Sequence, residues 1–301
     1  FSGLDNSIYK RINSYSQEDK MKKYKFKTKP FKHQKNALRD SWDKDYYALF
    51  MEMGTGKSKV AIDTMGILYT EGKIDAALII SPKGVYDNWV QGEIPTHLSD
   101  KIKINMVRWQ PSLAQWFQKA MRTLVYNRFK GLKIFVMNTE ALSTPRGASA
   151  AQTFLQENRN NIVIVDESTT IKNRSANRTQ NIMSLKQLSR YRRILTGSPV
   201  TRSPLDLFSQ CMFLSLYALN FKTFYAFQNR YGIVQKKFMG PRSFNEVVGY
   251  RRLDELNIKL LRFSNRVLKQ DCLDLPDKMY TTRLVPLSAD QKKAYDEMKQ
   301  L

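Results

Sequence analysis

The clearest indication of the fold is the stretch Tyr46-Tyr47-Ala48-Leu49-Phe50-Met51-Glu52-Met53-Gly54-Thr55-Gly56-Lys57-Ser58. Residues 46–51 form an unbroken apolar run, which is typical of a strand buried on both faces of a parallel sheet. A glycine-rich turn follows, and residues 59–69 carry apolar side chains at helical spacing. Glycines let successive backbone N–H groups turn inward, and a helix N-terminus adds a positive dipole end. A strand, a glycine loop and a helix in this order therefore predict a phosphate-binding site.

We expect this loop to hold the phosphates of a nucleotide. Lys57 would reach the β- and γ-phosphates, and the Ser58 hydroxyl would coordinate Mg²⁺. The longer pattern G-x-x-x-x-G-K-[ST] has glycine at the position of Met51, so only the shorter form G-x-G-K-S is present. The alternative is an ordinary glycine-rich turn, and the strand before it and the helix after it argue against that. The predicted nucleotide contacts in the loop are Met53, Gly54, Thr55, Gly56, Lys57 and Ser58.

A second buried strand, Ile162-Val163-Ile164-Val165, ends in the acidic pair Asp166-Glu167. We predict that Asp166 holds Mg²⁺ through water and that Glu167 orients and deprotonates the attacking water. On its own the pair could instead cap the segment that follows it. Combined with the upstream loop, it predicts a nucleoside-triphosphate hydrolase whose catalytic residues are Lys57, Asp166 and Glu167.

Short apolar runs alternate with helical patterns from about residue 46 onward. The runs lie at residues 46–51, 76–80, 104–107, 133–137, 162–165 and 193–195. The clearest helix follows Pro111 and Ser112, and its apolar face consists of Leu113, Trp116, Phe117, Ala120, Met121 and Leu124. This alternation predicts a doubly wound α/β fold with a mostly parallel central sheet and helices on both faces.

Changes in composition and residue pattern divide the chain into three parts. Residues 1–30 are a lysine-rich N-terminal extension, and residues 31–215 form the predicted ATP-binding lobe. Residues 216–301 read as a mainly helical, irregular subdomain, interrupted at Gly232 and Gly240-Pro241. Its aromatic residues are interleaved with basic ones, a pattern that can stack bases. We favour the simpler interpretation, in which these aromatics form a local core beneath a basic surface.

Charge points to a polyanionic partner. The 301 residues include 50 Lys and Arg against 27 Asp and Glu, a net charge of +23, which favours nucleic acid over a merely soluble basic protein. Residues 168–205 carry eight basic side chains and no acidic one, namely Lys172, Arg174, Arg178, Lys186, Arg190, Arg192, Arg193 and Arg202. Residues 222–270 carry eleven basic side chains against Glu246, Asp254 and Glu255.

Composition also argues against several classes of protein. No apolar run approaches the ~20 residues that span a bilayer, and the start of the chain lacks a signal-peptide pattern. Cys211, Cys272, His33 and His97 are too few for a disulfide framework or a zinc site. We therefore expect a soluble, reduced, intracellular protein, cytoplasmic in a bacterium or phage-infected host or nuclear in a eukaryote. Because the chain begins with Phe1, we expect processing or truncation at this end.

The motifs occur in an order that resembles the first RecA-like lobe of a superfamily 2 ATPase of the Swi/Snf type, over residues 31–301. Phe31-Lys32-His33-Gln34 resembles the Q motif, which implies that Gln34 lies against the adenine and adds Phe31 and Gln34 to the ATP contacts. The loop resembles D-E-M-G-x-G-K-[ST], with Met51 in place of Asp. Leu78-Ile79-Ile80-Ser81-Pro82-Lys83, followed by Asn88-Trp89, is similar to motif Ia.

The remaining motifs continue the resemblance toward the C-terminus. Val136-Met137-Asn138-Thr139-Glu140-Ala141-Leu142 is similar to the next motif on the DNA side, and Arg193-Ile194-Leu195-Thr196-Gly197-Ser198-Pro199 looks like L-T-G-T-P. Residues 260–268 and Leu275-Pro276-Asp277-Lys278 resemble the closing helical stretch and the L-P-x-K turn. The resemblance implies ATP hydrolysis, with ATP and Mg²⁺ as cofactors, stimulated by double-stranded DNA and coupled to movement along it. The implied contacts or coupling residues are Pro82, Lys83, Thr139, Thr196, Gly197 and Ser198, on the DNA backbone.

Two departures from the family pattern matter. The family usually has D-E-x-H, whereas Asp166-Glu167 is followed by Ser168-Thr169-Thr170, so coupling to DNA must use Thr169 or other groups, or be weaker. No second strand–helix array with paired arginines follows, although an arginine finger can accelerate phosphoryl transfer by ~10³–10⁵ in other systems. We therefore expect a fragment whose last residues, around Tyr295 and Met298, lead toward a second RecA-like lobe.

Two other functions stay open at this point. One is a strand-separating DNA or RNA helicase of the same superfamily. The stretch from Phe221 to Leu275 argues against it, because this stretch resembles the Swi/Snf insertion. The other is a basic DNA-binding module with a nucleotide site that does not hydrolyse ATP. The intact glycine loop and acidic pair count against it.

Overall fold

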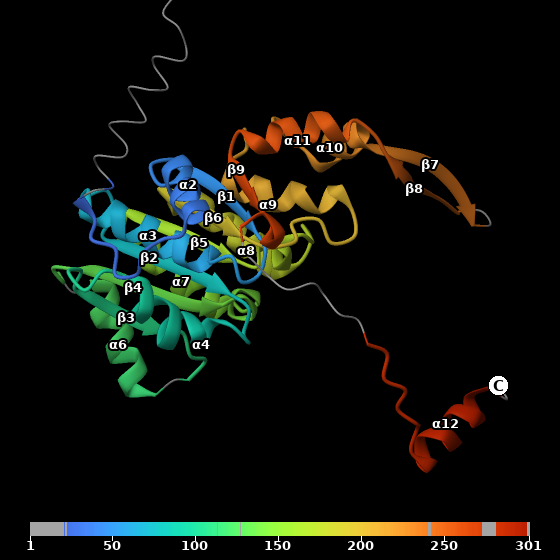
Figure 1. Cartoon of the computed structure of the whole chain (residues 1–301), viewed down its shortest axis with the longest axis horizontal. Coiled ribbons are helices and arrows are strands. Elements are labelled where there is room, and N and C mark those ends of the chain that lie inside the picture. The colour runs from blue at the N-terminus through green and yellow to red at the C-terminus, as the bar shows by residue number, and fades with distance from the viewer. Residues whose placement is uncertain are drawn as a thin grey trace, which may run out of the picture.

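A seven-stranded parallel sheet forms the centre of the molecule, shown in Figure 1 in a computed structural model that describes residues 21, 23–112, 114–126, 128–239, 242–272 and 281–299. The strand order is β3-β4-β2-β5-β6-β1-β9, and every neighbouring pair is parallel. The strands are β1 (Tyr46–Met51), β2 (Ala76–Ser81), β3 (Ile104–Arg108), β4 (Leu132–Asn138), β5 (Asn161–Asp166), β6 (Tyr191–Leu195) and β9 (Ser264–Val267). The predicted RecA-like α/β fold is confirmed.

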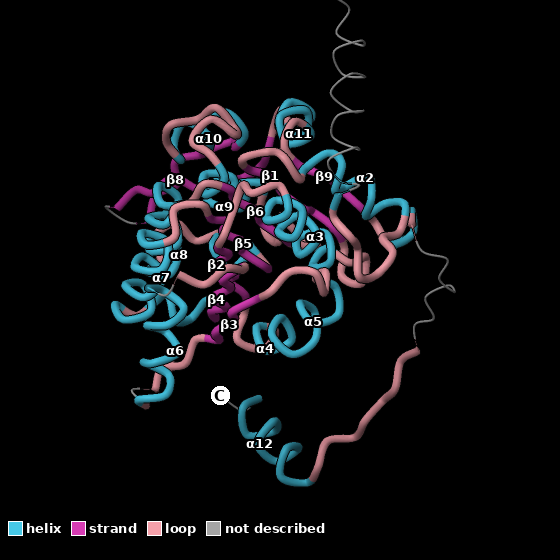
Figure 2. Tube along the Cα trace, turned by 90° about the vertical axis from the view of Figure 1, so that its left-hand side faces the viewer, coloured by secondary structure: helices cyan, strands magenta, loops and turns pink. Residues whose placement is uncertain are grey.

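Helices cover both faces of the sheet, as Figure 2 shows. One face carries α2 (Lys32–Ser41), α3 (Lys57–Thr70), and the short α4 (Tyr86–Asn88) and α5 (Ile94–His97), which a π-helical turn (Trp89–Glu93) joins. The other face carries α6 (Gln115–Tyr126), α7 (Pro145–Glu157), α8 (Asn177–Ser184) and α9 (Leu207–Leu214). Short 3₁₀ turns lie at Thr139–Ser143, Ser168–Ile171, Leu185–Leu188, Pro204–Asp206 and Lys269–Asp271. In the described residues no helix is long and apolar enough to cross a membrane.

The unbroken apolar runs are explained by burial on both sides of the sheet. In β2, Leu78 and Ile80 face the cluster beneath α6–α9, whereas Ala77 and Ile79 face the cluster beneath α2 and α3. A strand with both faces covered needs apolar side chains at every position rather than at alternate ones. Helix α3 is similarly enclosed, since its residues 59–68 are all buried.

The helix predicted after Ser112 is present as α6, which begins at Gln115. The Ser112 hydroxyl accepts a bond from the Ala114 backbone N–H at 3.0 Å. Phe117 and Leu124 are buried as expected, but Trp116 is 60% exposed and does not join the packed face. Leu113 lies outside the described residues.

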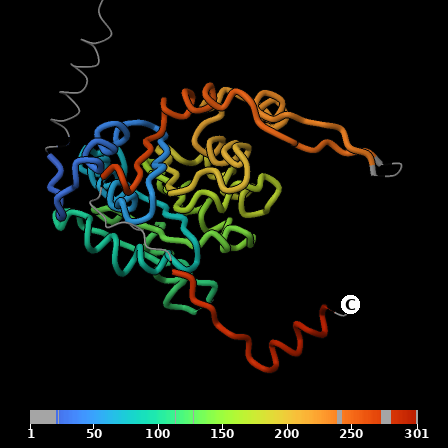
Figure 3. The backbone as a smooth tube through the Cα atoms, turned by 45° about the vertical axis from the view of Figure 1, so that its right-hand side comes forward, coloured from blue at the N-terminus to red at the C-terminus, as the bar shows by residue number. Residues whose placement is uncertain are grey.

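The C-terminal part differs from the mainly helical expectation. It contains α10 (Phe224–Tyr231) and α11 (Leu253–Leu261), but between them β7 (Gly232–Met239) and β8 (Arg242–Tyr250) form an antiparallel hairpin. Figures 1 and 3 show this hairpin projecting away from the sheet. The helical expectation over residues 260–268 is wrong for 264–267, which form β9 beside β1. A further helix, α12 (Ala289–Lys299), has only exposed residues.

Several predictions fall on residues that the structure does not describe. These are most of the N-terminal extension (1–20 and 22), the Gly240-Pro241 break and the Leu275-Pro276-Asp277-Lys278 turn. The three-part division of the chain, with a boundary near residue 215, stays a proposal.

Four of the interleaved aromatics of the C-terminal part, Phe221, Phe224, Phe227 and Tyr231, form a local core. Phe208 of α9 contacts the rings of Phe224 and Phe227, and Phe221 contacts those of Phe227 and Tyr231. Phe227 and Tyr231 are fully buried. The favoured interpretation therefore holds for α10. On the hairpin, by contrast, Phe238 and Phe244 are exposed.

Two members of the basic run at residues 168–205 serve the fold instead of the surface. Arg193 is fully buried and donates to the carbonyl oxygens of Ser41, the last residue of α2, and of Lys44, at 2.6 and 2.8 Å. Arg192 donates to the carbonyl of Leu214 at 2.7 Å. Helix ends leave carbonyl groups without helical partners, and these guanidinium groups satisfy them. Counting both arginines toward a nucleic-acid surface is therefore wrong.

Candidate active site

The glycine loop joins β1 to α3 as predicted. Gly54 and Gly56 adopt φ values of +87° and +82°, and Gly56 is the residue immediately before the helix. A Cβ atom on Gly56 would lie 2.2 Å from the Gln34 side-chain nitrogen. Both the left-handed backbone and the close approach require glycine here. The loop is thereby fixed with the N-terminus of α3 directed at its centre, where a phosphate would lie.

Helix α2 packs its N-terminal turn against this loop. The ring nitrogen Nε2 of His33 lies 2.8 Å from the Thr55 carbonyl oxygen, and Gln34 donates to the same oxygen at 3.1 Å. The Phe31 backbone N–H donates to Gln34 Oε1 at 2.9 Å. Gln34 is thus buried and its amide is engaged by protein groups, whereas Phe31 is 63% exposed and its ring stacks on His33. Gln34 is the predicted adenine contact, and its amide is already bonded to protein groups; Phe31, the other ATP contact predicted here, is the more accessible of the two.

Asp166 ends β5 and is buried, with a defined partner for each carboxylate oxygen. Trp89 Nε1 donates to Oδ2 and the Glu167 backbone N–H donates to Oδ1, both at 2.9 Å. Burial raises the pKa of Asp166, while the Trp89 bond and the nearby Lys57 ammonium act in the opposite direction. Trp89 belongs to the motif at residues 78–89, but no pattern in the sequence indicates that it would hold this carboxylate.

The glycine loop and the acidic pair meet. Lys57 Nζ lies 3.0 Å from Glu167 Oε1. Thr196, which follows β6, donates from its hydroxyl to Glu167 Oε2 at 3.2 Å. Since β5, β6 and β1 are adjacent in the sheet, the loops at their carboxyl ends converge there. This places a cation, an acid and a hydroxyl donor around one point at the edge of the sheet.

Two further contacts tie this centre to the loop after β6 and to β9. A Cβ atom on Gly197 would lie 3.2 Å from the Met53 backbone nitrogen, so the two loops touch backbone to backbone. From the other side, Arg266 of β9 donates to the Gly197 carbonyl at 3.1 Å, and the Lys269 backbone N–H donates to Glu52 at 2.6 Å. Neither Arg266 nor Lys269 is among the predicted site residues. Arg266 lies in the stretch 260–268 that was expected to be helical, and Lys269 follows directly after it.

The donor set fits magnesium. Ser58 and Asp166 offer hard oxygen ligands, and Mg²⁺ commonly takes one or two such protein ligands while water and substrate phosphates complete its shell. Among the described residues no group of three His, Cys, Asp or Glu side chains could hold a metal ion unaided. Most of the ligands would therefore come from water and from the bound phosphates.

The residues predicted to contact DNA divide into exposed and buried ones. Lys83 and Ser198 are exposed, and Pro82 and Gly197 are half-buried. Thr139 is only 1% exposed, so in this structure its side chain cannot make the predicted contact with a backbone phosphate. Thr196 is equally buried, and its bond to Glu167 suits the coupling role rather than direct DNA contact.

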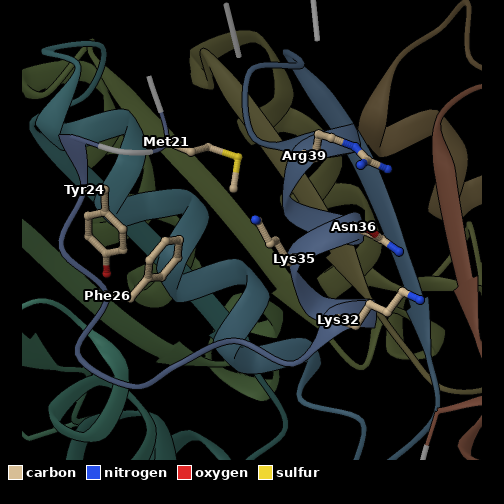
Figure 4. Close-up of a pocket in the computed structure, with 7 residues that line it drawn as sticks. All are labelled: Met21, Tyr24, Phe26, Lys32, Lys35, Asn36 and Arg39. Atoms are coloured by element: carbon tan, nitrogen blue, oxygen red, sulfur yellow. The ribbon is translucent and has the colours of Figure 1, made fainter. Parts of the chain in front are cut away.

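A separate hollow of about 530 Å³ lies beside α2 and contains none of the predicted ATP contacts (Figure 4). It is lined by Met21, Tyr24, Phe26, Lys32, Lys35, Asn36 and Arg39. Figure 4 shows Lys32, Asn36 and Arg39 pointing away from the two aromatic rings, while Lys35 points toward Met21. The basic groups do not converge on one point, so the hollow shows no common anion site.

Comparison with known proteins gives a consistent result. A family model described as the SNF2-related domain matches residues 33–301. The mouse SWI/SNF-related matrix-associated actin-dependent regulator of chromatin subfamily A containing DEAD/H box 1 is 25% identical over 255 residues, covering 81% of this chain and 22% of that protein. The mouse DNA annealing helicase and endonuclease ZRANB3 is 27% identical over 269 residues, covering 88% of this chain and 23% of that protein.

Solved structures agree on the fold. The Sulfolobus solfataricus SWI2/SNF2 ATPase core in complex with double-stranded DNA superimposes with a TM-score of 0.60 and 20% identity, covering 92% of this chain and 53% of that one. The core domain from the same organism gives a TM-score of 0.58. This chain spans about a fifth of the length of the curated relatives it matches.

Proposed function

The chain belongs to the SNF2-related domain family, and on that premise we propose that it is the ATP-binding lobe of a motor that couples ATP hydrolysis to movement along double-stranded DNA. The observation that carries the proposal is the 3.0 Å contact between Lys57 and Glu167, beside the buried Asp166. The relatives are named for chromatin regulation and for DNA annealing. Such activities require the protein to work inside the cell, where DNA and ATP are available.

The residues divide the chemistry among them. Lys57 neutralises charge on the β- and γ-phosphates, and a phosphate at the loop competes with Glu167 for the Lys57 ammonium. Released from Lys57, the Glu167 carboxylate accepts the proton of the attacking water. Ser58 and Asp166 would hold Mg²⁺, which when bound polarises the phosphates and offsets their negative charge. Phe31 stacks on the adenine, and the exposed Lys83 and Ser198 contact DNA phosphates.

ATP hydrolysis by such a motor needs a second lobe. A second RecA-like lobe, from sequence outside this chain, would supply the arginine that stabilises charge in the transition state. Because only one lobe is represented, we expect the isolated chain to hydrolyse ATP slowly or not at all.

The test uses the intact protein, with ATPase rates measured without nucleic acid, with duplex DNA and with RNA. We expect duplex DNA to stimulate hydrolysis more than RNA does. Glu167→Gln should lower turnover by about 10²–10⁴-fold while ATP still binds, because it removes the base and leaves the phosphate loop intact. Lys57→Ala should also abolish turnover, and the exposed Glu157→Gln serves as the matched carboxylate control. Equal rates with and without duplex DNA would contradict the proposal.

Movement and strand separation can be distinguished with two substrates. A translocase that leaves the strands paired displaces the third strand of a triplex in the presence of ATP and leaves a forked duplex intact. Unwinding of the fork would instead assign the protein to the strand-separating helicases.

A further inference from the structure

The residue after the acidic pair is linked to a distant buried amide. The Ser168 hydroxyl donates to Gln210 Oε1 at 2.7 Å. Both side chains are fully buried, and Gln210 lies in α9 on the face of the sheet opposite α3. A buried polar side chain keeps its place only when its partners are satisfied, because water cannot replace a lost bond there.

The other end of the Gln210 amide holds the loop that follows β6. Nε2 donates to the carbonyl oxygen of Pro199 at 2.8 Å and to that of Asp206 at 2.9 Å. Turning the amide over would place its NH₂ group against the Ser168 hydroxyl and its oxygen against two carbonyl oxygens. The three bonds therefore fix the orientation of the amide and, with it, the spacing between Ser168 and Pro199.

The loop continues as a braced turn that reaches the surface. The Asp206 carboxylate accepts bonds from the Thr201 hydroxyl at 2.8 Å and from the Arg202 backbone N–H at 3.0 Å. Ser198, Thr201 and Arg202 are themselves exposed. If an outside contact displaces this turn, Pro199 should move with it, and the Pro199 carbonyl is hydrogen-bonded to Gln210.

We propose that Gln210 is a positioning residue that transmits contact between DNA and the loop after β6 to the acidic pair, through Ser168. The inference rests on the proposed function, in which phosphates of DNA contact this exposed turn. It also offers a route for coupling to DNA in a chain that has Thr169 where the family has His. In this route the hydrogen bond to the loop after β6 is made by the neighbouring Ser168, through Gln210. Through Ser168, Gln210 acts on the backbone of Glu167, whose carboxylate Lys57 and Thr196 already hold.

The chain offers a matched control for loss of a buried amide. Asn161 is fully buried at the start of β5, the end opposite Asp166. Its Nδ2 donates to the carbonyls of Asn158 and Leu188 at 2.7 and 2.9 Å. Its Oδ1 accepts from the Arg190 backbone N–H at 3.1 Å. Gln210 and Asn161 thus make the same pattern of bonds, but only Gln210 joins the two loops of the active site.

The experiment compares Gln210→Met, Ser168→Ala and Asn161→Leu with the wild type in the intact protein. ATPase turnover and KM for ATP are measured with and without duplex DNA, and folding is checked by thermal melting. We expect Gln210→Met and Ser168→Ala to lower the ratio of stimulated to basal turnover by about 5–150-fold, the usual range for coupling between sites. KM for ATP should stay within about twofold. Asn161→Leu should lower the melting temperature and leave the ratio unchanged.

Each other outcome counts against the inference. An unchanged ratio in folded Gln210→Met or Ser168→Ala overturns it while the proposed function stands. An equal loss of the ratio in Asn161→Leu overturns it as well, because the effect would then come from stability alone. If Gln210→Met does not fold, Ser168→Ala decides the matter, since it removes one bond and little volume. A wild type that DNA does not stimulate overturns the proposed function and the inference together.

Discussion

Glu167 is held in a backbone conformation that few residues other than glycine adopt. Its φ of +45° lies in the left-handed region, which for a residue other than glycine costs of the order of 1–3 kcal/mol. Three contacts maintain it, since Lys57 and Thr196 bind the carboxylate and the backbone N–H donates to Asp166. The strained turn directs the carboxylate at the phosphate loop, so the backbone itself positions the proposed general base.

Besides packing in the core, Trp89 should matter for magnesium binding. Trp89→Phe keeps an aromatic ring in the buried site but removes the N–H that donates to Asp166. Without this bond the Asp166 carboxylate is less well oriented and harder to ionise. We expect the apparent affinity for Mg²⁺ with ATP to fall by about 10–100-fold, as is usual when a group supporting a metal ligand is lost. Titrating Mg²⁺ against ATPase rate in the intact protein measures this.

Trp42 supplies the control for that substitution. It is buried to the same degree, and within the described part of the chain its Nε1 has no hydrogen-bond partner. Trp42→Phe should therefore change stability without moving the Mg²⁺ dependence. An identical shift in both variants would mean that ring volume, and not the bond to Asp166, sets the metal affinity.

The sequence predicts the local parts of the site better than the distant ones. The conformation of the glycine loop follows from its own residues, because left-handed φ values select Gly54 and Gly56. The bond from Trp89 to Asp166 joins residues 77 apart. It depends on how α4 and the π-helical turn pack beside β5, which no short motif encodes. Whether each residue performs its predicted catalytic role stays a prediction.

Among whole strands and helices, the central ones follow their sequence patterns and the peripheral ones do not. All six predicted strands are present because each contains an apolar run. Five of them are largely buried, whereas β3, at the edge of the sheet, is partly exposed. The four residues of β9, Ser264-Asn265-Arg266-Val267, are mostly polar, so pairing with β1 rather than propensity makes them a strand. The hairpin of β7 and β8 was not predicted either, and its aromatics Phe238 and Phe244 are exposed rather than buried.

Glu255 joins α10 to α11 through an exposed ionic cluster. Arg230 Nε donates to its carboxylate at 3.0 Å, Tyr231 donates at 3.0 Å, and Lys259 Nζ lies 3.2 Å away. The Arg230 bond is the main reason that the pKa of Glu255 falls from 4.5 to about 2. A carboxyl with a depressed pKa adds stability above its unfolded pKa and loses it as the pH falls through the folded one.

Acid should therefore weaken the contact between α10 and α11 between pH 4.5 and about 2. In Glu255→Gln this part of the acid sensitivity should be missing, so its stability and that of the wild type should converge as the pH drops through that window. Urea unfolding at a series of pH values measures the convergence. The neighbouring exposed Asp254→Asn is the control and should keep the wild-type pH dependence. Parallel curves for wild type and Glu255→Gln would contradict the assignment.

For the molecule as a whole, the net charge of +23 overstates the basic surface. Arg192 and Arg193 are used inside the fold, and Lys59 is buried in an ion pair with Asp63 at 2.7 Å. Exposed cations such as Lys83, Arg174 and Arg202 remain available. Composition alone cannot separate these groups, because the distinction depends on which carbonyl groups and carboxylates the fold brings to each side chain.

Binding of duplex DNA should depend steeply on salt and little on sequence. Contacts to phosphates release counterions, so a surface that makes 6–10 such contacts loses about 10³–10⁵ in affinity between 50 and 200 mM salt. Fluorescence anisotropy with two unrelated duplexes of equal length measures both properties. We expect parallel, steep salt plots for the two sequences. A flat plot, or a strong preference for one duplex, would argue that base edges rather than phosphates are recognised.

The position of β1 has a consequence for biosynthesis. This strand carries the phosphate loop, yet it pairs with β6 and β9, which come much later in the chain. While the protein is being translated, the loop leaves the ribosome long before either neighbour exists. The nascent chain can complete this region only after residues 264–267 have emerged, because pairings between distant segments form late. The strand that carries the phosphate loop thereby gains its second neighbour only when the last strand of the central sheet has been made.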